Sequence, residues 1–123
     1  MRLAIKMQPP FVIDLPLPTS ANRMWRAARG RIYKNPDYLE WIRCADGLLL
    51  ASGLNRGRSP VAGRYRMKVI VREHIRLDPD NTLKPLSDWA QHAGIIENDK
   101  HLRALALEYG DIGNDCRLIV EAL

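Results

Sequence analysis

The sequence predicts a small α+β fold, in which one mixed β-sheet is flanked by two helices. Three observations support this class. The chain has 123 residues, enough for a single packed core. Segments with the period of a strand alternate with segments that have the period of a helix. Pro and Gly fall between these segments, where turns are expected. We therefore expect residues 1–123 to form one domain, with residues 1–10 as an N-terminal extension.

In the first half of the chain, residues 11–17 (FVIDLPL) predict a strand that is closed by two prolines, which lack amide donors. Residues 19–35 have no clear period and are expected to be a loop. A helix facing the core is predicted from Pro36, with this proline in its first turn and Gly53 just past its end. Residues 55–63 (NRGRSPVAG) have the composition of a mobile loop.

In the second half, residues 64–75 alternate between one apolar and one mainly basic face and predict a strand. A second helix is expected over residues 82–92, because proline is tolerated in the first turn and Pro85 would fix the start there. Thr82 or a near neighbour would then be the N-cap, and Gly94 would end the helix. Residues 102–109 and 116–122 predict two strands joined by a turn.

Several classes of protein are not favoured. No run approaches the about 20 apolar residues of a membrane-spanning helix, and prolines interrupt the N-terminal segment where a signal peptide needs an apolar core. We therefore expect a cytoplasmic protein without a membrane partner. Cys44 and Cys116 are expected to be free, buried thiols. The three histidines are scattered without the spacing of a zinc site, and we expect no small-molecule cofactor.

Positive charge is concentrated in two blocks. The net charge is +5, and neither residues 23–34 nor residues 56–72 contain an acidic side chain. Arg and Lys neutralise phosphates, and nearby aromatic side chains can stack on bases. The alternative is a solvated basic surface. The candidate DNA-binding residues are Arg23, Arg26, Arg29, Arg31, Lys34, Arg64, Arg66 and Lys68.

The acidic residues of interest lie in one segment, residues 78–99. Asp78 and Asp80 are two residues apart, so in an extended segment both carboxylates would face the same side. Carboxylates held this close favour a hard divalent cation such as Mg²⁺ between them. Asp99 would join them if the chain doubles back after the second helix. A metal of this kind supports phosphodiester hydrolysis.

Lys84 and Asp88 are four residues apart and would share a helix face behind this cluster. The lysine would neutralise charge that develops on the phosphate or protonate the leaving group. Each element has a simpler alternative. The Asp78–Asn81 segment also suits a turn or a helix cap, Lys84 and Asp88 suit a surface ion pair, and Asp99 suits a loop.

These residues resemble the RusA family of Holliday-junction resolvases over nearly the whole chain, from about Phe11 to Ala122. The resemblance lies in the DxDN motif at residues 78–81, the lysine three residues later, and a hydrophobic tail that ends in Asp99. The N-terminal LPLPTSANRMWRAARGR is also similar to that family. The resemblance implies a RusA-like, homodimeric, Mg²⁺-dependent endonuclease that cuts four-way DNA junctions by paired nicks.

The resemblance implies the following roles, with Mn²⁺ as the alternative ion. The catalytic residues would be Asp78, Asp80, Lys84 and Asp99, and the metal ligands Asp78, Asp80 and Asp99, with Asp88 as a further candidate. This chain has Asn98 where the family often has a second acid, which makes the site one negative charge lighter. The alternatives are a nuclease for other branched DNA, a junction-binding protein whose site has decayed, and a magnesium-stabilised structural dimer.

Overall fold

The computed structural model describes residues 8–123. The N-terminal extension expected over residues 1–10 lies largely outside them. The strands are β1 (Phe11–Leu15), β2 (Trp25–Ala28), β3 (Arg31–Lys34), β4 (Tyr65–Arg72), β5 (Leu102–Gly110) and β6 (Cys116–Ala122). The helices are α1 (Pro36–Ser52) and α2 (Pro79–His92), with short 3-10 helices at Ala21–Arg23 and Asp99–His101. The predicted α+β class is confirmed.

The main sheet has four strands in the order β1-β6-β4-β5. Strand β4 pairs in parallel with β5 and antiparallel with β6, so the sheet is mixed, as predicted. The strands expected at residues 102–109 and 116–122 are present, but they do not pair with each other. Strand β4 lies between them, because its alternating apolar residues occupy the centre of the sheet, where one face is fully covered.

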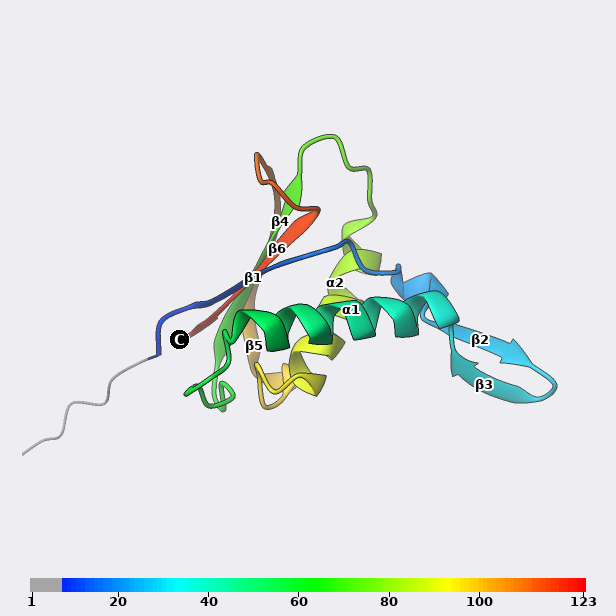
Figure 1. Cartoon of the computed structure of the whole chain (residues 1–123), viewed down its shortest axis with the longest axis horizontal. Coiled ribbons are helices and arrows are strands. Elements are labelled where there is room, and N and C mark those ends of the chain that lie inside the picture. The colour runs from blue at the N-terminus through cyan, green and yellow to red at the C-terminus, as the bar shows by residue number, and fades with distance from the viewer. Residues whose placement is uncertain (1–7) are drawn as a thin grey trace, which may run out of the picture.

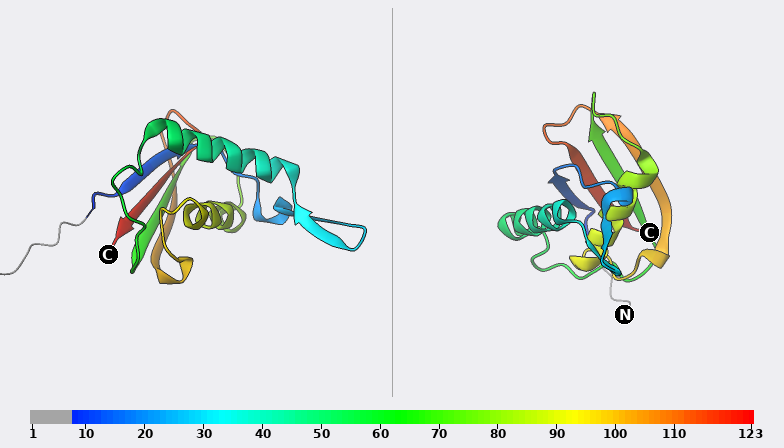
Figure 2. Two further views of the ribbon diagram at one scale, coloured as in Figure 1. Left: turned by 60° about the horizontal axis from the view of Figure 1, so that its bottom comes forward. Right: turned by 90° about the vertical axis from the view of Figure 1, so that its right-hand side faces the viewer.

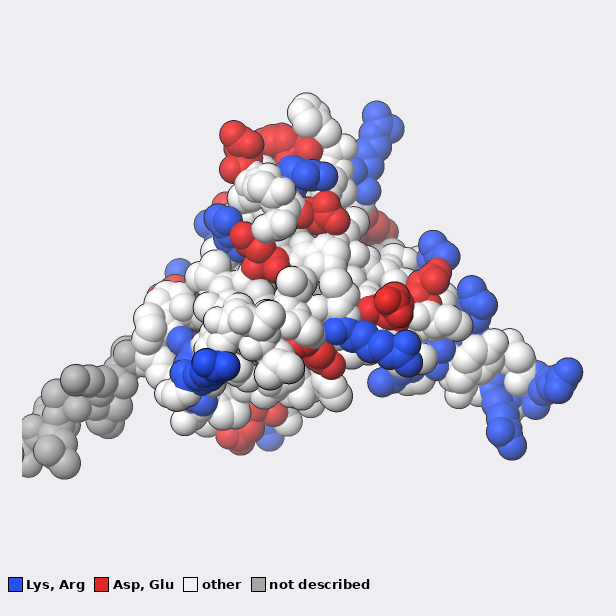
Figure 3. Space-filling model, viewed as in Figure 1, with Lys and Arg blue, Asp and Glu red and all other residues white. Residues whose placement is uncertain are grey.

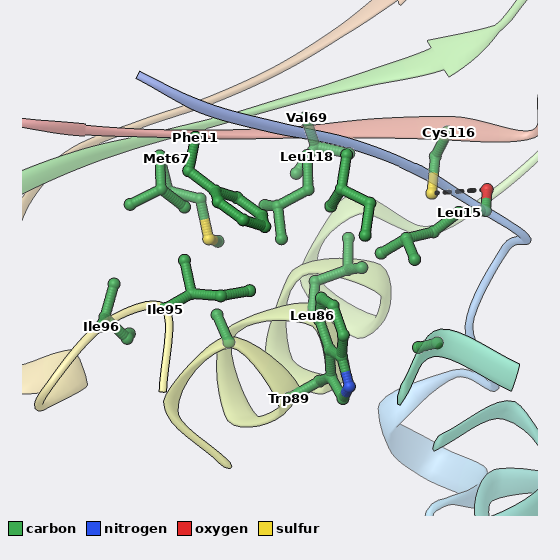
Figure 4. Packing of buried hydrophobic residues seen from close by; sticks show 14 of the residues in the cluster. Phe11, Leu15, Met67, Val69, Leu86, Trp89, Ile95, Ile96, Cys116 and Leu118 are labelled. Carbon is green, nitrogen blue, oxygen red and sulfur yellow. Dashed lines mark hydrogen bonds between the residues drawn. The ribbon is translucent and has the colours of Figure 1, made fainter. Parts of the chain in front are cut away.

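Both helices pack against one face of this sheet (Figure 2). The buried side chains of β4 alternate along the strand, as the sequence predicted, and are Tyr65, Met67, Val69 and Val71. Leu86 and Trp89 of α2 point toward the sheet in Figure 4, where they meet apolar residues of β1, β4 and β6. The helix-covered face of the sheet is thus the core of the protein.

Helix α1 confirms its predicted start and end. The Asn35 side chain caps the first turn by accepting a hydrogen bond from Asp37 N, and Pro36 follows directly. Gly53 ends the helix in the left-handed conformation, with φ of 66°. None of the described helices has the length and apolar character needed to cross a membrane.

The prediction of a loop over residues 19–35 is wrong, since strands β2 and β3 pair there as an antiparallel hairpin. All residues of both strands are exposed, so no alternation of apolar and polar residues marks them in the sequence. Arg29 and Gly30 form the turn, with φ of 51° and 74°. Positive φ at both central residues is the geometry of a type I′ hairpin turn.

The predicted start of α2 is also wrong. Asp78, not Thr82, is the N-cap, and its side chain accepts a hydrogen bond from Asp80 N. Pro79 takes the first helical position, where a missing N–H costs nothing, and Pro85 lies inside the helix in a buried position. Two prolines compete for the first turn, and the one preceded by a capping aspartate takes it.

The cysteine prediction is partly confirmed. Both thiols are free, and Cys116 is buried. Burial raises the pKa of Cys116 to about 12, with a further contribution from Asp115 and Asp14. Cys44 is exposed on α1, contrary to the prediction of a buried thiol.

Candidate nucleic-acid interface and acidic site

The β2–β3 hairpin extends away from the body of the protein at the N-terminal end of α1 (Figure 1). The expected DNA-binding residues of the first basic block are all exposed: Arg23, Arg26, Arg29, Arg31 and Lys34. Figure 3 shows Lys and Arg side chains at the far end of this arm and no acidic side chain beside them. An exposed β-ribbon whose charged side chains are all basic is suited to contact phosphates along a nucleic acid.

The two ends of the hairpin are joined by a hydrogen bond from the Asn35 amide N–H to Met24 O, at 2.8 Å. Met24 and Asn35 are both buried, whereas every residue between them is exposed. The arm is therefore attached through its two ends and contributes no buried side chain of its own to the core.

The second basic block is partly neutralised within the protein. Arg64, Arg66 and Lys68 lie on or beside β4, as expected, but Lys68 Nζ is 3.0 Å from Glu108 Oε1 of β5. Further along the strand, Arg72 pairs with Asp115 at 3.3 Å. Arg64 and Arg66 are exposed. Less positive charge is thus available here for a partner than on the hairpin.

The helical start of α2 changes the arrangement of the first two aspartates. Asp78 and Asp80 occupy the N-cap and the first turn, so the expectation of an extended segment is wrong. Asp78 Oδ1 accepts from Asp80 N at 3.2 Å, and Oδ2 accepts from Asn81 Nδ2 at 2.9 Å. Asp78 has the capping role that the sequence left open as an alternative, and this role holds its carboxylate in place.

Asp99 lies at the other end of α2. Its amide N–H donates to Gln91 Oε1 in the last turn, at 3.0 Å. A helix rises about 1.5 Å per residue, which places the two ends of this 14-residue helix about 20 Å apart. The chain turns at Gly94 but does not bring Asp99 back to the N-terminal end.

Asp99 instead lies near Tyr65 at the start of β4. Burial raises the pKa of the Tyr65 phenol; the Ser87 hydroxyl nearby lowers it, and the Asp99 carboxylate raises it. Tyr65 Oη is buried without a hydrogen-bond partner in the described part of the chain. The Ser87 hydroxyl is therefore close to it but not in hydrogen-bonding geometry. Asp99 is therefore in a different electrostatic environment from Asp78.

Lys84 and Asp88 share a face of α2, as predicted, with Nζ and Oδ2 3.5 Å apart. Both side chains are partly exposed, so the pair by itself contributes little to stability. Asp88 also acts on Tyr38 of α1: burial raises the pKa of that phenol, and the Asp88 carboxylate raises it further. Asp88 thus lies near Tyr38 of α1.

A cleft of about 370 Å³ lies at the N-terminal end of α2. Asp78 and Asn81 line it from the helix, and Arg23 lines it from the root of the hairpin. Arg76 and Asp37 also line the cleft, and sequence reasoning missed both. Arg76 is two residues before the acidic motif, which was the available signal. Only the fold shows that Asp37 belongs to the site, because it comes from α1.

The predicted three-aspartate metal centre does not form within the described residues. No group of three or more His, Cys, Asp or Glu side chains there could hold one ion. A smaller site fits better, since Mg²⁺ commonly takes one or two carboxylates and completes its shell with waters and substrate phosphates. Asp78 and Asp80, at the same helix end, fit such a site. Asp99 does not lie with them.

No protein-family model matches the chain, and no curated protein sequence matches it either. The resemblance to the RusA family therefore depends on the motif residues themselves.

Proposed function

We propose that this protein is a divalent-metal-dependent endodeoxyribonuclease that resolves four-way DNA junctions in recombination and repair. One observation carries the proposal. Arg23 flanks the cationic hairpin and also lines the cleft that contains Asp78. A DNA strand bound along the hairpin would therefore be led to the carboxylates at the N-terminal end of α2.

Within this proposal, Asp78 and Asp80 hold the ion, and Mg²⁺ is favoured over Mn²⁺. When bound, the ion polarises the phosphate and supplies a hydroxide nucleophile at neutral pH. The guanidinium group of Arg76, together with that of Arg23, which pairs with Asp37 at 3.6 Å, orients the phosphate in the cleft. Lys84, one turn further along α2, neutralises charge on the phosphate oxygens.

The direct test is cleavage of a labelled, mobile four-way junction, beside linear duplex and forked DNA, with Mg²⁺ and with a chelator. Symmetric paired nicks on the junction alone, dependent on Mg²⁺, are expected. Equal cleavage of forked DNA would favour a nuclease for branched DNA in general. Junction binding without product at any Mg²⁺ concentration would favour a binding protein with a decayed site.

Asp80→Asn is expected to lower the cleavage rate by about 100-fold or more while junction binding persists, since a catalytic ion supplies several kcal/mol. Asp99→Asn separates the two possible ligand sets. If Asp78 and Asp80 suffice, it retains most of the activity; a loss equal to that of Asp80→Asn would restore Asp99 to the metal site. Cleavage by Asp80→Asn at the wild-type rate would refute the assignment.

Asn98→Asp tests the missing acid directly. Asn98 Oδ1 accepts a hydrogen bond from Lys100 N at 3.0 Å, and aspartate caps a helix equally well. The substitution therefore adds a carboxylate without changing the local structure. Asn98 lies beside Asp99, at the other end of α2 from Asp78, so no gain in cleavage is expected if Asp78 and Asp80 hold the ion. Cleavage recovered by Asn98→Asp would return the Asp99 end of α2 to the metal site.

Paired nicks also require two sites, and we propose a homodimer for this reason. Strand β5 is an edge of the sheet, nine residues long and without proline. Leu105 and Tyr109 on it are 46% and 49% exposed. A long apolar edge of this kind favours pairing with another strand. Antiparallel pairing of two copies about Ala106 would place Leu105 opposite the partner's Leu107.

Light scattering after size-exclusion chromatography tests the dimer. Leu105→Lys is expected to give a monomer that nicks junctions without pairing the cuts. Val12→Lys is the matched control, because Val12 is 41% exposed on β1 at the opposite edge. Loss of the dimer in the control as well would contradict the assignment to β5.

A further inference from the structure

A second cavity, of about 420 Å³, lies where the hairpin joins the two helices. We call it the hairpin-root cavity. Trp25 and Lys34 line it from the first pair of the hairpin, Tyr38 from α1, and Asp88, Trp89 and His92 from α2. Its volume falls within the range of about 300–1,000 Å³ that is typical of small-molecule sites. The sequence analysis did not predict a cavity at this position.

The cavity offers a flat aromatic surface. Trp25 is 51% exposed although it borders the cavity, so a large part of its indole is available to a ligand. Tyr38 behind it is buried and stacked on Trp41, with ring centroids 6.5 Å apart and planes within 7°. One wall is thus held rigidly by the core, and the other belongs to the exposed hairpin.

The polar groups of the cavity include both hydrogen-bond donors and acceptors. Asp88 supplies an acceptor that is held by Lys84, and Lys34 supplies a donor. The imidazole of His92 provides either function. An aliphatic ligand would leave these groups unpaired, and a purely anionic ligand would meet the Asp88 carboxylate. A flat heterocycle with donors and acceptors on its edge satisfies all of them.

We propose that the hairpin-root cavity takes an unpaired nucleobase of the DNA strand held by the hairpin. The base stacks on Trp25, its edge meets Asp88 and His92, and its phosphates lie against the cations of the hairpin. This inference depends on the DNA-binding part of the proposed function and not on cleavage. It explains why a tryptophan is exposed within a cationic arm, since base–aromatic stacking adds affinity that charge alone does not supply.

The test compares two ligands of equal charge: a short single-stranded DNA, and the same sugar-phosphate chain with every base removed. Binding is measured with a chelator present, so that no cleavage interferes. The wild-type protein is expected to prefer the strand with bases by about 5- to 150-fold, the contribution of one stacked base. Trp25→Ala should abolish this preference and leave the affinity for the base-free strand unchanged.

Two further variants keep the test specific. Trp25→Phe should restore part of the preference, because phenylalanine still stacks. Ile32→Ala is the matched control: Ile32 lies on the same face of the hairpin as Trp25 and is 75% exposed, but it does not line the cavity. It should behave as wild type. Arg29→Ala should weaken both ligands equally.

The outcomes separate this inference from the proposed function. Wild-type affinity that is equal for the two strands would overturn the base site, even if the protein cuts junctions. A preference that depends on Trp25 in a protein that never cuts would support the base site and refute the nuclease. A change of oligomeric state in Trp25→Ala, with the preference unchanged, would assign the cavity to a second copy and overturn the inference.

Discussion

Every residue of strands β2 and β3 is exposed, whereas helix α2 buries five of its 14 residues. The hairpin carries the positive charge of the proposed interface, and α2 carries the carboxylates. Within residues 8–123, the hairpin reaches the buried interior at its root, where Met24 and Asn35 are buried. In α2, surface residues such as Asp80 and Lys84 alternate with core residues such as Leu86 and Trp89.

This difference determines how substitutions act. Changes in the hairpin should alter binding without altering stability, because the folded state gains little from its side chains. Changes in α2 should affect both, because its carboxylates are positioned by a helix whose other face is in the core. The two regions therefore respond to different measurements, and the first three of the following predictions test one region or both.

The largest effect on stability is expected for Trp89→Ala. Trp89 is 1% exposed, packs edge-on against Trp41, and donates its indole N–H to Asp46 Oδ1 at 2.9 Å. Truncation should lower the free energy of unfolding by about 3–5 kcal/mol. Trp25→Ala in the hairpin should change it by less than about 0.5 kcal/mol. Urea denaturation checks both. Similar losses for the two tryptophans would contradict the independence of the hairpin.

The next largest effect is on DNA affinity. Replacing Arg26, Arg29 and Arg31 together with Ala should weaken junction binding and flatten its salt dependence, by about 0.9 in the log–log slope for each phosphate that the hairpin no longer neutralises. The unfolding midpoint should not change. Arg43→Ala is the control, since Arg43 is also exposed, pairs with Glu40 on α1, and lies outside both basic blocks. An unchanged slope in the triple variant would exclude the hairpin from the interface.

Substitutions of Asp78 separate its structural role from its chemical role. Asp78→Ala removes the cap and should lower the free energy of unfolding by about 1 kcal/mol. Asp78→Asn retains a side chain that caps well, so its stability should match wild type. Both should lose cleavage if Asp78 holds the metal. Full activity in Asp78→Asn would mean that Asp78 is only a helix cap.

The smallest predicted effect is on the pH dependence of stability, and it comes from an ion pair in the main sheet. Two hydrogen bonds from Arg117 hold the pKa of Asp14 below its usual value of 3.8, against the opposing effect of burial. A carboxyl group with a lowered pKa stabilises the folded state above its unfolded pKa, and this is lost as pH falls through the folded pKa.

Asp14→Asn should therefore lower the melting temperature near pH 7 by a few degrees at most, since both side chains are about one third exposed. The difference from wild type should disappear below the folded pKa of Asp14. Thermal melts between pH 2 and 7 test this. A difference that stays constant with pH would show that the ion pair is not its source.

Much of the fold could be predicted from local patterns. Pro36 in the first turn and Gly53 just past the end predict the limits of α1, and the alternation along β4 identifies its buried face. These signals succeed because they depend on neighbouring residues along one helix or strand. The hairpin was missed because its strands bury nothing and so have no apolar period. Its signal was the Arg29–Gly30 turn, which is recognised by backbone conformation.

The sequence by itself determined which residues carry the candidate chemistry: a cationic segment around Arg29, an acidic motif at Asp78 and Asp80, and a lysine one turn further on. Only the tertiary structure decided which of them meet. It placed Arg23, Asp37 and Asp78 in one cleft, and it separated Asp99 from that cleft by the length of α2. The reason is physical: caps and turns depend on local hydrogen bonds, whereas the position of Asp99 depends on how α2 and the segment after it pack against the sheet.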